Sequence, residues 1–118
     1  MLLAVHLDSS GIRWQRPLGI VPSLVHHKEA GRWGSRAFGG PLITAGGLVF
    51  VAGTQDDMIR AFDTDTGEEM WSDHLPAGGQ AAPMTYRYRG TQYLVIAAGG
   101  RSGIGSPGDW MVAWRLRD

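Results

Sequence analysis

The stretch "AFDTDTGEEMWSDHLPAGGQAAPMTY", residues 61–86, decides the fold because part of it occurs twice in the chain. A fainter version, "AVHLDSSGIRWQRPLG", occupies residues 4–19. Three pairs of identical residues share one separation of 57 positions: Ala4 and Ala61, Trp14 and Trp71, Leu18 and Leu75. This period is somewhat longer than the roughly 40–50 residues of a four-stranded blade, so the repeat predicts a propeller with a long inserted loop.

Length and composition limit the classes of protein that the chain can represent. Its 118 residues suit one modest domain or a piece of something larger, and 43% apolar content is enough for a core. Eleven basic and eleven acidic residues balance, which argues against a nucleic-acid partner or a polybasic membrane anchor. The absence of cysteine excludes disulfides and thiolate chemistry. No apolar run approaches the roughly 18 residues that span a bilayer, and "MLLAVHLD" lacks the features of a signal peptide.

Short strands separated by tight turns are the predicted secondary structure, because the chain has 18 glycines and 6 prolines and no capped helical periodicity. Five segments have the character of strands: residues 2–7, 48–53, 58–63, 92–98 and 109–116. Residues 41–45 and 82–89 are weaker candidates. Gly46-Gly47 and Arg89-Gly90 are expected to close two hairpins.

The repeated residues are of the types that pack one blade on the next. A small Ala61 leaves room for a neighbour, Asp63 can accept backbone N–H groups in a turn, and Gly67 supplies the turn conformation. Trp71 is expected to lie flat between adjacent blades. The first copy is degraded, with His6 in place of the aspartate and its glycine displaced by one position. The repeat therefore predicts packing and not chemistry.

The motif Ala-x-Asp-x-x-Thr-Gly-x-x-x-Trp-x-x-x-Leu resembles the tryptophan-docking repeat of the quinoprotein dehydrogenases, eight-bladed propellers that use pyrroloquinoline quinone (PQQ). Four further phrases resemble the carboxyl-terminal end of the membrane-bound PQQ-dependent glucose/quinate/shikimate dehydrogenases: "GGPLITAGGLVFVAGT", "LPAGGQAAPMTY", "QYLVIAAGG" and "GDWMVAWRL". The resemblance runs from about Ala4 to Leu116 and is weakest over residues 20–35.

The resemblance implies an all-β fold comprising about two of the eight blades. Residues 4–18 would be the outer strands of one blade, 19–40 an inserted loop, 41–75 a full blade and 83–116 part of the last blade. The family's catalytic aspartate, calcium ligands and PQQ-stacking tryptophan lie in earlier blades, so no catalytic or metal-binding residue is expected here. The chain would then be a fragment whose partners are the missing N-terminal blades of the same enzyme. Two blades with exposed strand edges are expected to be poorly stable and prone to association.

The implied activity is the oxidation of a sugar or cyclic polyol. In the family, a general base removes the hydroxyl proton while hydride moves to PQQ, which is held with calcium or magnesium; the electrons pass to a membrane quinone at the periplasmic face of the bacterial inner membrane. The isolated chain is expected to be inactive. The alternative is a non-catalytic propeller scaffold that shares only the docking repeat. The phrases "LPAGGQAAPMTY" and "GDWMVAW" argue against it, because they resemble the dehydrogenases and not only the blade repeat.

Candidate cofactor-binding residues lie in "RAFGGPLITAGG", residues 36–47, where the resemblance implies that the entry to the blade's first strand faces the funnel that holds PQQ. Gly39 and Gly40 would let the backbone approach a flat cofactor, Arg36 could meet one of its three carboxylates, and Phe38 could wall the pocket. The alternative is an entry turn with a solvated arginine. Asp56 could support a metal–PQQ site, and a solvated turn with Asp57 is its alternative.

Three further motifs each have a structural alternative. "GIGSPG", residues 103–108, fits a dinucleotide fingerprint, but a strand is expected after it, which favours a blade loop. "DTDTG", residues 63–67, hints at a calcium loop, with turn formation as the alternative. His26 and His27 with Glu29 could bind a metal, but adjacent histidines point to opposite sides of an extended chain, which favours an exposed loop.

Arg101 follows "AAGG" at a position where the membrane glucose dehydrogenases commonly have a histidine. The loop that continues to Asp109 is also a residue shorter than in the family. Both departures leave the substrate open.

Overall fold

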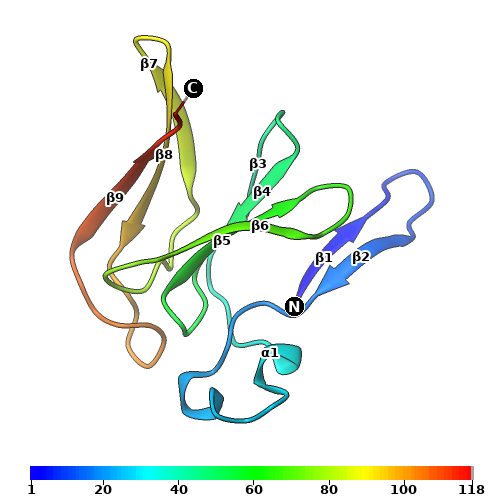
Figure 1. Ribbon diagram of the computed structural model, residues 1–118, viewed down its shortest axis with the longest axis vertical. Coiled ribbons are helices and arrows are strands. Elements are labelled where there is room, and N and C mark those ends of the chain that lie inside the picture. The colour runs from blue at the N-terminus through cyan, green and yellow to red at the C-terminus, as the bar shows by residue number, and fades with distance from the viewer. Residues whose placement is uncertain (118) are drawn as a thin grey trace.

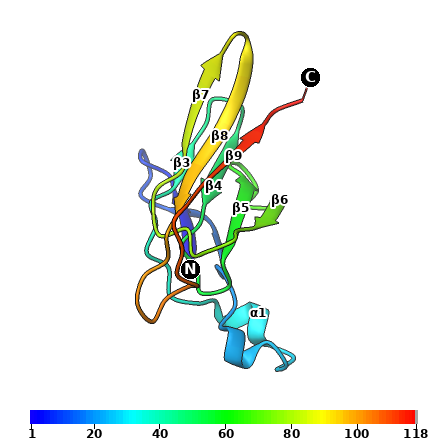
Figure 2. The same ribbon diagram turned by 90° about the vertical axis from the view of Figure 1, so that its left-hand side faces the viewer.

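The computed structural model describes residues 1–117, which fold into three antiparallel sheets. The first pairs β1 (Leu2–Val5) with β2 (Ile12–Arg16), and the second has the order β3 (Leu42–Ile43), β4 (Leu48–Val51), β5 (Met58–Asp63), β6 (Glu69–His74). The third contains β7 (Met84–Tyr88), β8 (Thr91–Ala98) and β9 (Trp110–Arg115). Figure 1 shows the sheets fanned out side by side, and Figure 2 shows the fan from its edge. The predicted all-β, blade-like architecture is confirmed.

The 57-residue repeat is preserved in the strand register. Ala4 lies opposite Trp14 in the first sheet, and Ala61 lies opposite Trp71 in the second. In both pairs of strands the register shifts directly after the alanine. The turn conformation is also kept, because Ser10 has a φ of 54° where Gly67, 57 residues later, has 70°. The displaced glycine of the first copy thus leaves a serine in the left-handed region, which glycine adopts more readily.

Two apolar layers hold the sheets together. Between the first and second sheets lie buried Leu18, Val49, Val51 and Phe62, with Leu2 and Trp14 packed against them. Between the second and third sheets lie buried Ile59, Leu75, Ile96 and three alanines, with Trp71 and Trp114 at their border. Burying one such leucine or isoleucine side chain contributes roughly 1.5–3 kcal/mol. Leu18 and Leu75 occupy the same place in the two copies of the repeat, so each copy closes its own layer.

The docking tryptophans explain why the repeat needs its glycine. Trp14 lies on the turn between β5 and β6, where its Nε1 donates a hydrogen bond of 3.0 Å to the carbonyl oxygen of Thr64. A Cβ added to Gly67 would lie 2.6 Å from Cδ2 of Trp14. Trp71 lies at the border between the second and third sheets and forms a T-shaped pair with Trp114, at an interplanar angle of 84° and a centroid distance of 5.5 Å.

The connections divide into tight hairpins and longer loops. Arg89 and Gly90 both have positive φ, 48° and 79°, and close the predicted β7–β8 hairpin. The inserted loop, for which no helix was predicted, contains a 3₁₀ turn η1 (Pro22–Leu24) and a one-turn helix α1 (Ala30–Trp33). Within residues 1–117, no helix has the length and hydropathy needed to cross a bilayer. In Figure 1 the longer connections gather toward the lower part of the view, below the strands, whereas the hairpin turns project from the fan.

Candidate functional site: the loop end of the sheets

Four connections meet at one end of the sheets, which we call the loop end: residues 34–41, 52–57, 75–83 and 99–109. Backbone hydrogen bonds join them to one another. Phe38 N donates to Gly53 O over 3.1 Å, and Gly100 N donates to Gly78 O over 2.8 Å. Leu75 N donates to the carbonyl oxygen of Asp57 over 2.7 Å. The loop end is therefore one connected surface built from two sheets.

An aromatic ring and two guanidinium groups are exposed at the loop end. Phe38 is 47% exposed, and the guanidinium carbon of Arg101 lies 5.3 Å from the centre of its ring, in a cation–π contact. Arg36 is exposed two residues before Phe38. The sequence pattern suggested Arg36 and Phe38 as a pair, and the structure adds Arg101 from the third sheet. This group offers positive charge beside a flat apolar surface.

Contacts within the protein explain why glycine occupies positions 39 and 40. A Cβ on Gly39 would come within 2.9 Å of Ala52 O and 3.2 Å of Ala81 O, so three backbone segments pack against this residue. A Cβ on Gly40 would lie 3.3 Å from Cβ of Ala82, a milder crowding. The sequence predicts an approach of a cofactor to these glycines, and what the structure shows is a close approach of other segments of the chain.

Asp56 is the centre of an internal hydrogen-bond network. One carboxylate oxygen accepts hydrogen bonds from Arg60 over 2.6 Å and from Ile20 N over 2.9 Å, while the other accepts from Arg60 Nη1 over 3.2 Å and from the Thr54 hydroxyl. Burial acts to raise the pKa of Asp56, but the hydrogen bonds and the charge of Arg60 outweigh it and hold the pKa below its usual value of 3.8. The carboxylate is thus fixed as an anion that joins the inserted loop to the second sheet. It is not part of a solvated turn.

Asp57 performs a second connecting role. Its φ of 56° is unusual for a residue other than glycine, and its carboxylate accepts hydrogen bonds from Ser106 N, over 2.9 Å, and from the Ser106 hydroxyl. Residues 103–108 therefore form a blade loop anchored on the neighbouring sheet. Strand β9, and not a helix, follows them, so the dinucleotide-binding interpretation is wrong.

Gln80 is a loop-end residue that sequence reasoning missed. Its Nε2 and Oε1 atoms are both buried and have no hydrogen-bond partner among residues 1–117. A Cβ added to Gly78 or to Gly105 would lie 3.2 Å from Gln80 Nε2, so the amide is enclosed by these glycines. Unsatisfied buried amides are costly and rare. The only signal in the sequence is a polar residue in the apolar run "AGGQAAP".

The remaining candidates behave as turn residues. Oδ1 of Asp63 accepts the backbone N–H groups of Asp65 and Thr66, both over 2.8 Å, and these bonds lower its pKa. "DTDTG" is thus a turn closed by its first aspartate. Nδ1 of His27 accepts the N–H of Glu29 over 3.3 Å, and the His27 ring lies 4.5 Å from that of Trp33. Among residues 1–117, no three His, Cys, Asp or Glu side chains gather as a metal site would require.

Comparison with known proteins gives consistent results. Residues 1–94 match the beta-propeller domain of the glucose/ethanol/alcohol dehydrogenases. The chain is 39% identical to the quinoprotein glucose dehydrogenase of Escherichia coli (strain K12), covering 98% of the chain and 15% of the relative. It is 41% identical to a probable quinate dehydrogenase (quinone) of Xanthomonas campestris pv. juglandis, covering 99% of the chain and 16% of the relative. Among solved structures, the quinohemoprotein alcohol dehydrogenase of Comamonas testosteroni matches with a TM-score of 0.53 and 30% identity, over 64% of this chain and 12% of that one.

Proposed function

The chain belongs to the family of PQQ-dependent dehydrogenases, and we propose that it forms part of an enzyme that oxidises a CH–OH group of a sugar or cyclic polyol. It spans about 15% of the length of the glucose dehydrogenase that it matches. The rest of the active protein is then formed by further blades. Those blades supply the catalytic base and the ligands of calcium or magnesium.

The observation that carries the proposal is the exposed group at the loop end. PQQ is flat and bears three carboxylates, and the structure offers an exposed ring, Phe38, with the Arg101 guanidinium beside it and the exposed Arg36 two residues earlier in the chain. Arginine pairs with carboxylates through a planar fork, and an aromatic face suits a planar ligand. The residues present thus fit one edge of such a cofactor.

When bound, PQQ accepts the two electrons that leave the alcohol carbon. The residues of this chain bind and orient. Arg36 and Arg101 hold carboxylates, Phe38 covers one side, and Gly39 keeps the segment close to Ala52 so that Phe38 stays at the surface. Asp56 acts indirectly, because its hydrogen bonds to Arg60 and Ile20 fix the inserted loop that leads to Arg36.

The electron acceptor and the location are further parts of the proposal. Two related proteins carry "(quinone)" in their names, which supports a membrane quinone as the acceptor for this protein also. We further propose that the enzyme acts at the periplasmic face of the bacterial inner membrane, which a membrane quinone as acceptor supports.

Binding of PQQ to the purified 118-residue protein tests the cofactor site. We expect PQQ to quench tryptophan fluorescence with saturation, and Arg36→Ala and Arg101→Ala each to raise the dissociation constant roughly tenfold through loss of a charge-assisted pair. Arg89→Ala is the matched control, since it removes the same charge at the β7–β8 hairpin. Equal increases of the dissociation constant in all three variants would show that PQQ does not bind at the loop end.

Catalysis by the isolated chain is tested separately with PQQ, calcium, glucose or quinate, and an artificial electron-accepting dye. We expect no dye reduction, because no described side chains gather here as a metal site. Measurable PQQ-dependent reduction would show that the chain carries its own catalytic centre, contrary to the proposal.

A further inference from the structure

The loop of residues 99–108 brings Arg101 to the Phe38 ring, yet its composition gives it little stiffness. Five of its ten residues are glycines, which lose more conformational freedom on folding than any other residue. A loop of this kind adopts one conformation only where other parts of the chain hold it. The contacts that hold residues 99–108 therefore decide where Arg101 lies.

The Arg101 side chain is not fixed by an ion pair. Within residues 1–117, the ion pairs of basic side chains are made by Arg13, Arg32 and Arg60. The guanidinium of Arg101 is exposed, and its contact with Phe38 is a cation–π interaction, which is weak at exposed positions. The guanidinium is thus free to meet an anion, and its position depends mainly on the backbone of its loop.

A short turn connects Arg101 to the buried part of this loop. Arg101 N donates a hydrogen bond to Ile104 O over 3.1 Å, and Ile104 N donates one to Arg101 O over 2.8 Å. The Ile104 side chain is buried and anchors the turn in apolar surroundings. Gly105 and Ser106 follow directly. Because the turn is closed by two hydrogen bonds, a contact that fixes Ser106 also fixes the place at which Arg101 leaves the loop.

Asp57, from the connection between β4 and β5, makes such a contact. Its carboxylate accepts hydrogen bonds from Ser106 N, over 2.9 Å, and from the Ser106 hydroxyl. On the other side, Ser106 O accepts the N–H of Gly78 over 2.8 Å. Hydrogen bonds to an ionised acceptor are roughly twice as strong as those between neutral groups. Asp57 is also buried, so water competes little with Ser106.

The backbone around Asp57 is adapted to this contact. A Cβ added to Gly105 would lie 2.8 Å from Oδ1 of Asp57, so glycine at this position lets the loop approach the carboxylate. Asp57 itself has a φ of 56°, which glycine would adopt with less strain. A side chain that occupies a strained position at a candidate site points to a role for that side chain.

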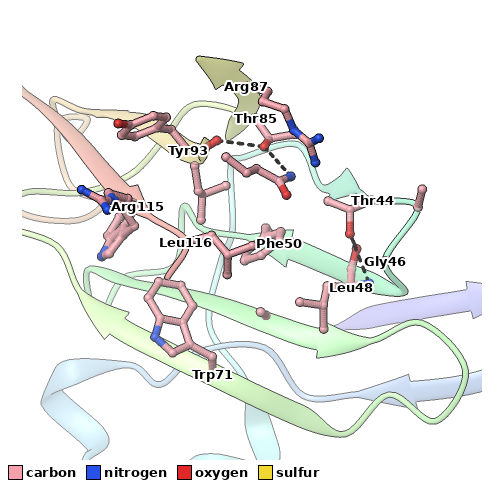
Figure 3. A pocket seen from close by; sticks show the side chains of 15 residues that line it. Thr44, Gly46, Leu48, Phe50, Trp71, Thr85, Arg87, Tyr93, Arg115 and Leu116 are labelled. Carbon is pink, nitrogen blue, oxygen red and sulfur yellow. Dashed lines mark hydrogen bonds between the residues drawn. The ribbon is translucent and has the colours of Figure 1, made fainter. Parts of the chain in front are cut away.

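The opposite ends of the second and third sheets give Arg101 no comparable support. Figure 3 shows Thr44 and Thr85 at a groove of about 710 Å³ between these sheets, and none of the residues that line it belongs to the loop end. The placement of Arg101 relative to Phe38 therefore relies on the apolar layer between the sheets and on the contacts at the loop end.

We propose that Asp57 is a positioning residue of the cofactor site, which through Ser106 holds Arg101 beside Phe38 in readiness for a carboxylate of PQQ. The inference rests on the proposed function for the identity of the ligand, whereas the placement of Arg101 is a property of the protein without ligand. Asp57 touches no ligand itself. A loop that is ordered before binding loses less conformational entropy when the ligand arrives, which raises the affinity.

Side-chain NMR of the 118-residue protein without ligand tests the positioning directly. The Nε–H proton of Arg101 should show a ring-current shift from Phe38. We expect Asp57→Gly to lose most of this shift, because it removes the carboxylate while glycine suits the φ of 56°. Ser106→Ala should reduce the shift. Asp57→Asn should keep it, since the amide can accept from Ser106 N and donate to the Ser106 hydroxyl.

Thr66→Ala is the matched control for the loss of the Ser106 hydroxyl. Asp63 accepts the backbone N–H of Thr66 over 2.8 Å and its hydroxyl over 3.2 Å, which is the same pairing at the β5–β6 turn. This variant should leave the Arg101 shift unaltered. An unaltered shift in Asp57→Gly, or an equal loss in Thr66→Ala, would overturn the inference.

A double-mutant cycle with PQQ tests whether Asp57 acts through Arg101. Quenching of tryptophan fluorescence should show that Asp57→Gly raises the dissociation constant roughly fivefold in the parent and less than about twofold in Arg101→Ala. Equal increases in both backgrounds would mean that Asp57 acts through the general stability of the fold, and the inference would fail. If Arg101→Ala alone leaves PQQ binding unaltered, the proposed cofactor site is wrong, while the NMR shift still decides whether Asp57 places Arg101.

Discussion

Replacing Gly67 by alanine should weaken the contact between the first and second sheets more than a comparable substitution elsewhere. The added Cβ would lie 2.6 Å from Trp14 Cδ2, and Gly67 has a φ of 70° that alanine adopts with strain. Left-handed backbone costs roughly 1–2 kcal/mol for a residue with a side chain. Displacing the indole also weakens the Trp14–Thr64 hydrogen bond, worth about 1 kcal/mol, and some packing of similar value.

Gly90→Ala is the control that isolates the packing effect. Gly90 has a φ of 79°, and nothing lies within 4 Å of a Cβ placed there. Both variants therefore share the backbone strain and the reduced entropy of the unfolded chain, and they differ only in contact with Trp14. We expect Gly67→Ala to lose about 2 kcal/mol more free energy of unfolding than Gly90→Ala.

Urea and thermal unfolding followed by tryptophan fluorescence measure this difference. For a chain of this size, about 2 kcal/mol corresponds to a separation of about 8 °C in midpoint. The measurements belong at low protein concentration, so that association between copies does not add to the apparent stability. Equal losses in the two variants would refute the inference that an indole on Gly67 holds the sheets together.

Three other substitutions should change stability in defined directions. Asp56→Asn should cost about 3 kcal/mol near neutral pH, because it leaves nearly buried Arg60 with Glu69, 3.8 Å from its Nε, as its remaining ion pair. Because the folded-state pKa of Asp56 is lowered, its carboxylate stabilises the fold fully above pH 3.8, and this stabilisation is lost as the pH falls through the folded-state pKa. Urea titrations at decreasing pH should therefore show a larger drop in the free energy of unfolding for the parent than for Asp56→Asn. Ser10→Gly should raise the free energy of unfolding by about 0.5 kcal/mol, and with it the urea midpoint, because it relieves the strain of a φ of 54°. An unchanged or lower midpoint contradicts this prediction. Gln80→Met should stabilise the protein by about 1–2 kcal/mol, because its buried amide atoms have no protein partner; a loss of stability would reveal a partner that the described residues do not supply.

Strand positions were predictable because their signals are local. Alternation of apolar residues and glycine-containing turns identified the strands from β3 to β5 and from β7 to β9, and the shared offset identified β2 and β6 as outer strands. The helical turn α1 has only four residues and lacks a side-chain cap, so no periodic pattern announces it. Its position depends on contacts made by the surrounding loop.

The candidate site was predictable only in part, because its contacts cross between sheets. Arg36 and Phe38 are neighbours in sequence and could be grouped by inspection. Arg101 reaches Phe38 only after the third sheet packs on the second, and the hydrogen bonds of Asp57 to Ser106 hold that loop in place. The pattern "QDD" likewise gave no sign that Asp56 faces inward to Arg60 while Asp57 faces the next sheet.

Packing and the proposed cofactor binding use different ends of the sheets, which has a consequence for substitutions. Trp14, Thr64 and Gly67 lie at the β5–β6 hairpin, whereas Arg36, Phe38 and Arg101 lie at the loop end. The loop end also carries two features that cost stability, namely the strained φ of Asp57 and the buried amide of Gln80, which has no hydrogen-bond partner among residues 1–117. Strain of this kind clusters at functional sites, although Ser10 shows that a hairpin used for packing carries it too. Stabilising changes at Ser10 should therefore leave PQQ binding unaltered. For Gln80→Met, a gain in stability with weaker PQQ binding would identify a functional amide, whereas a gain in stability with unaltered binding would identify a tolerated defect.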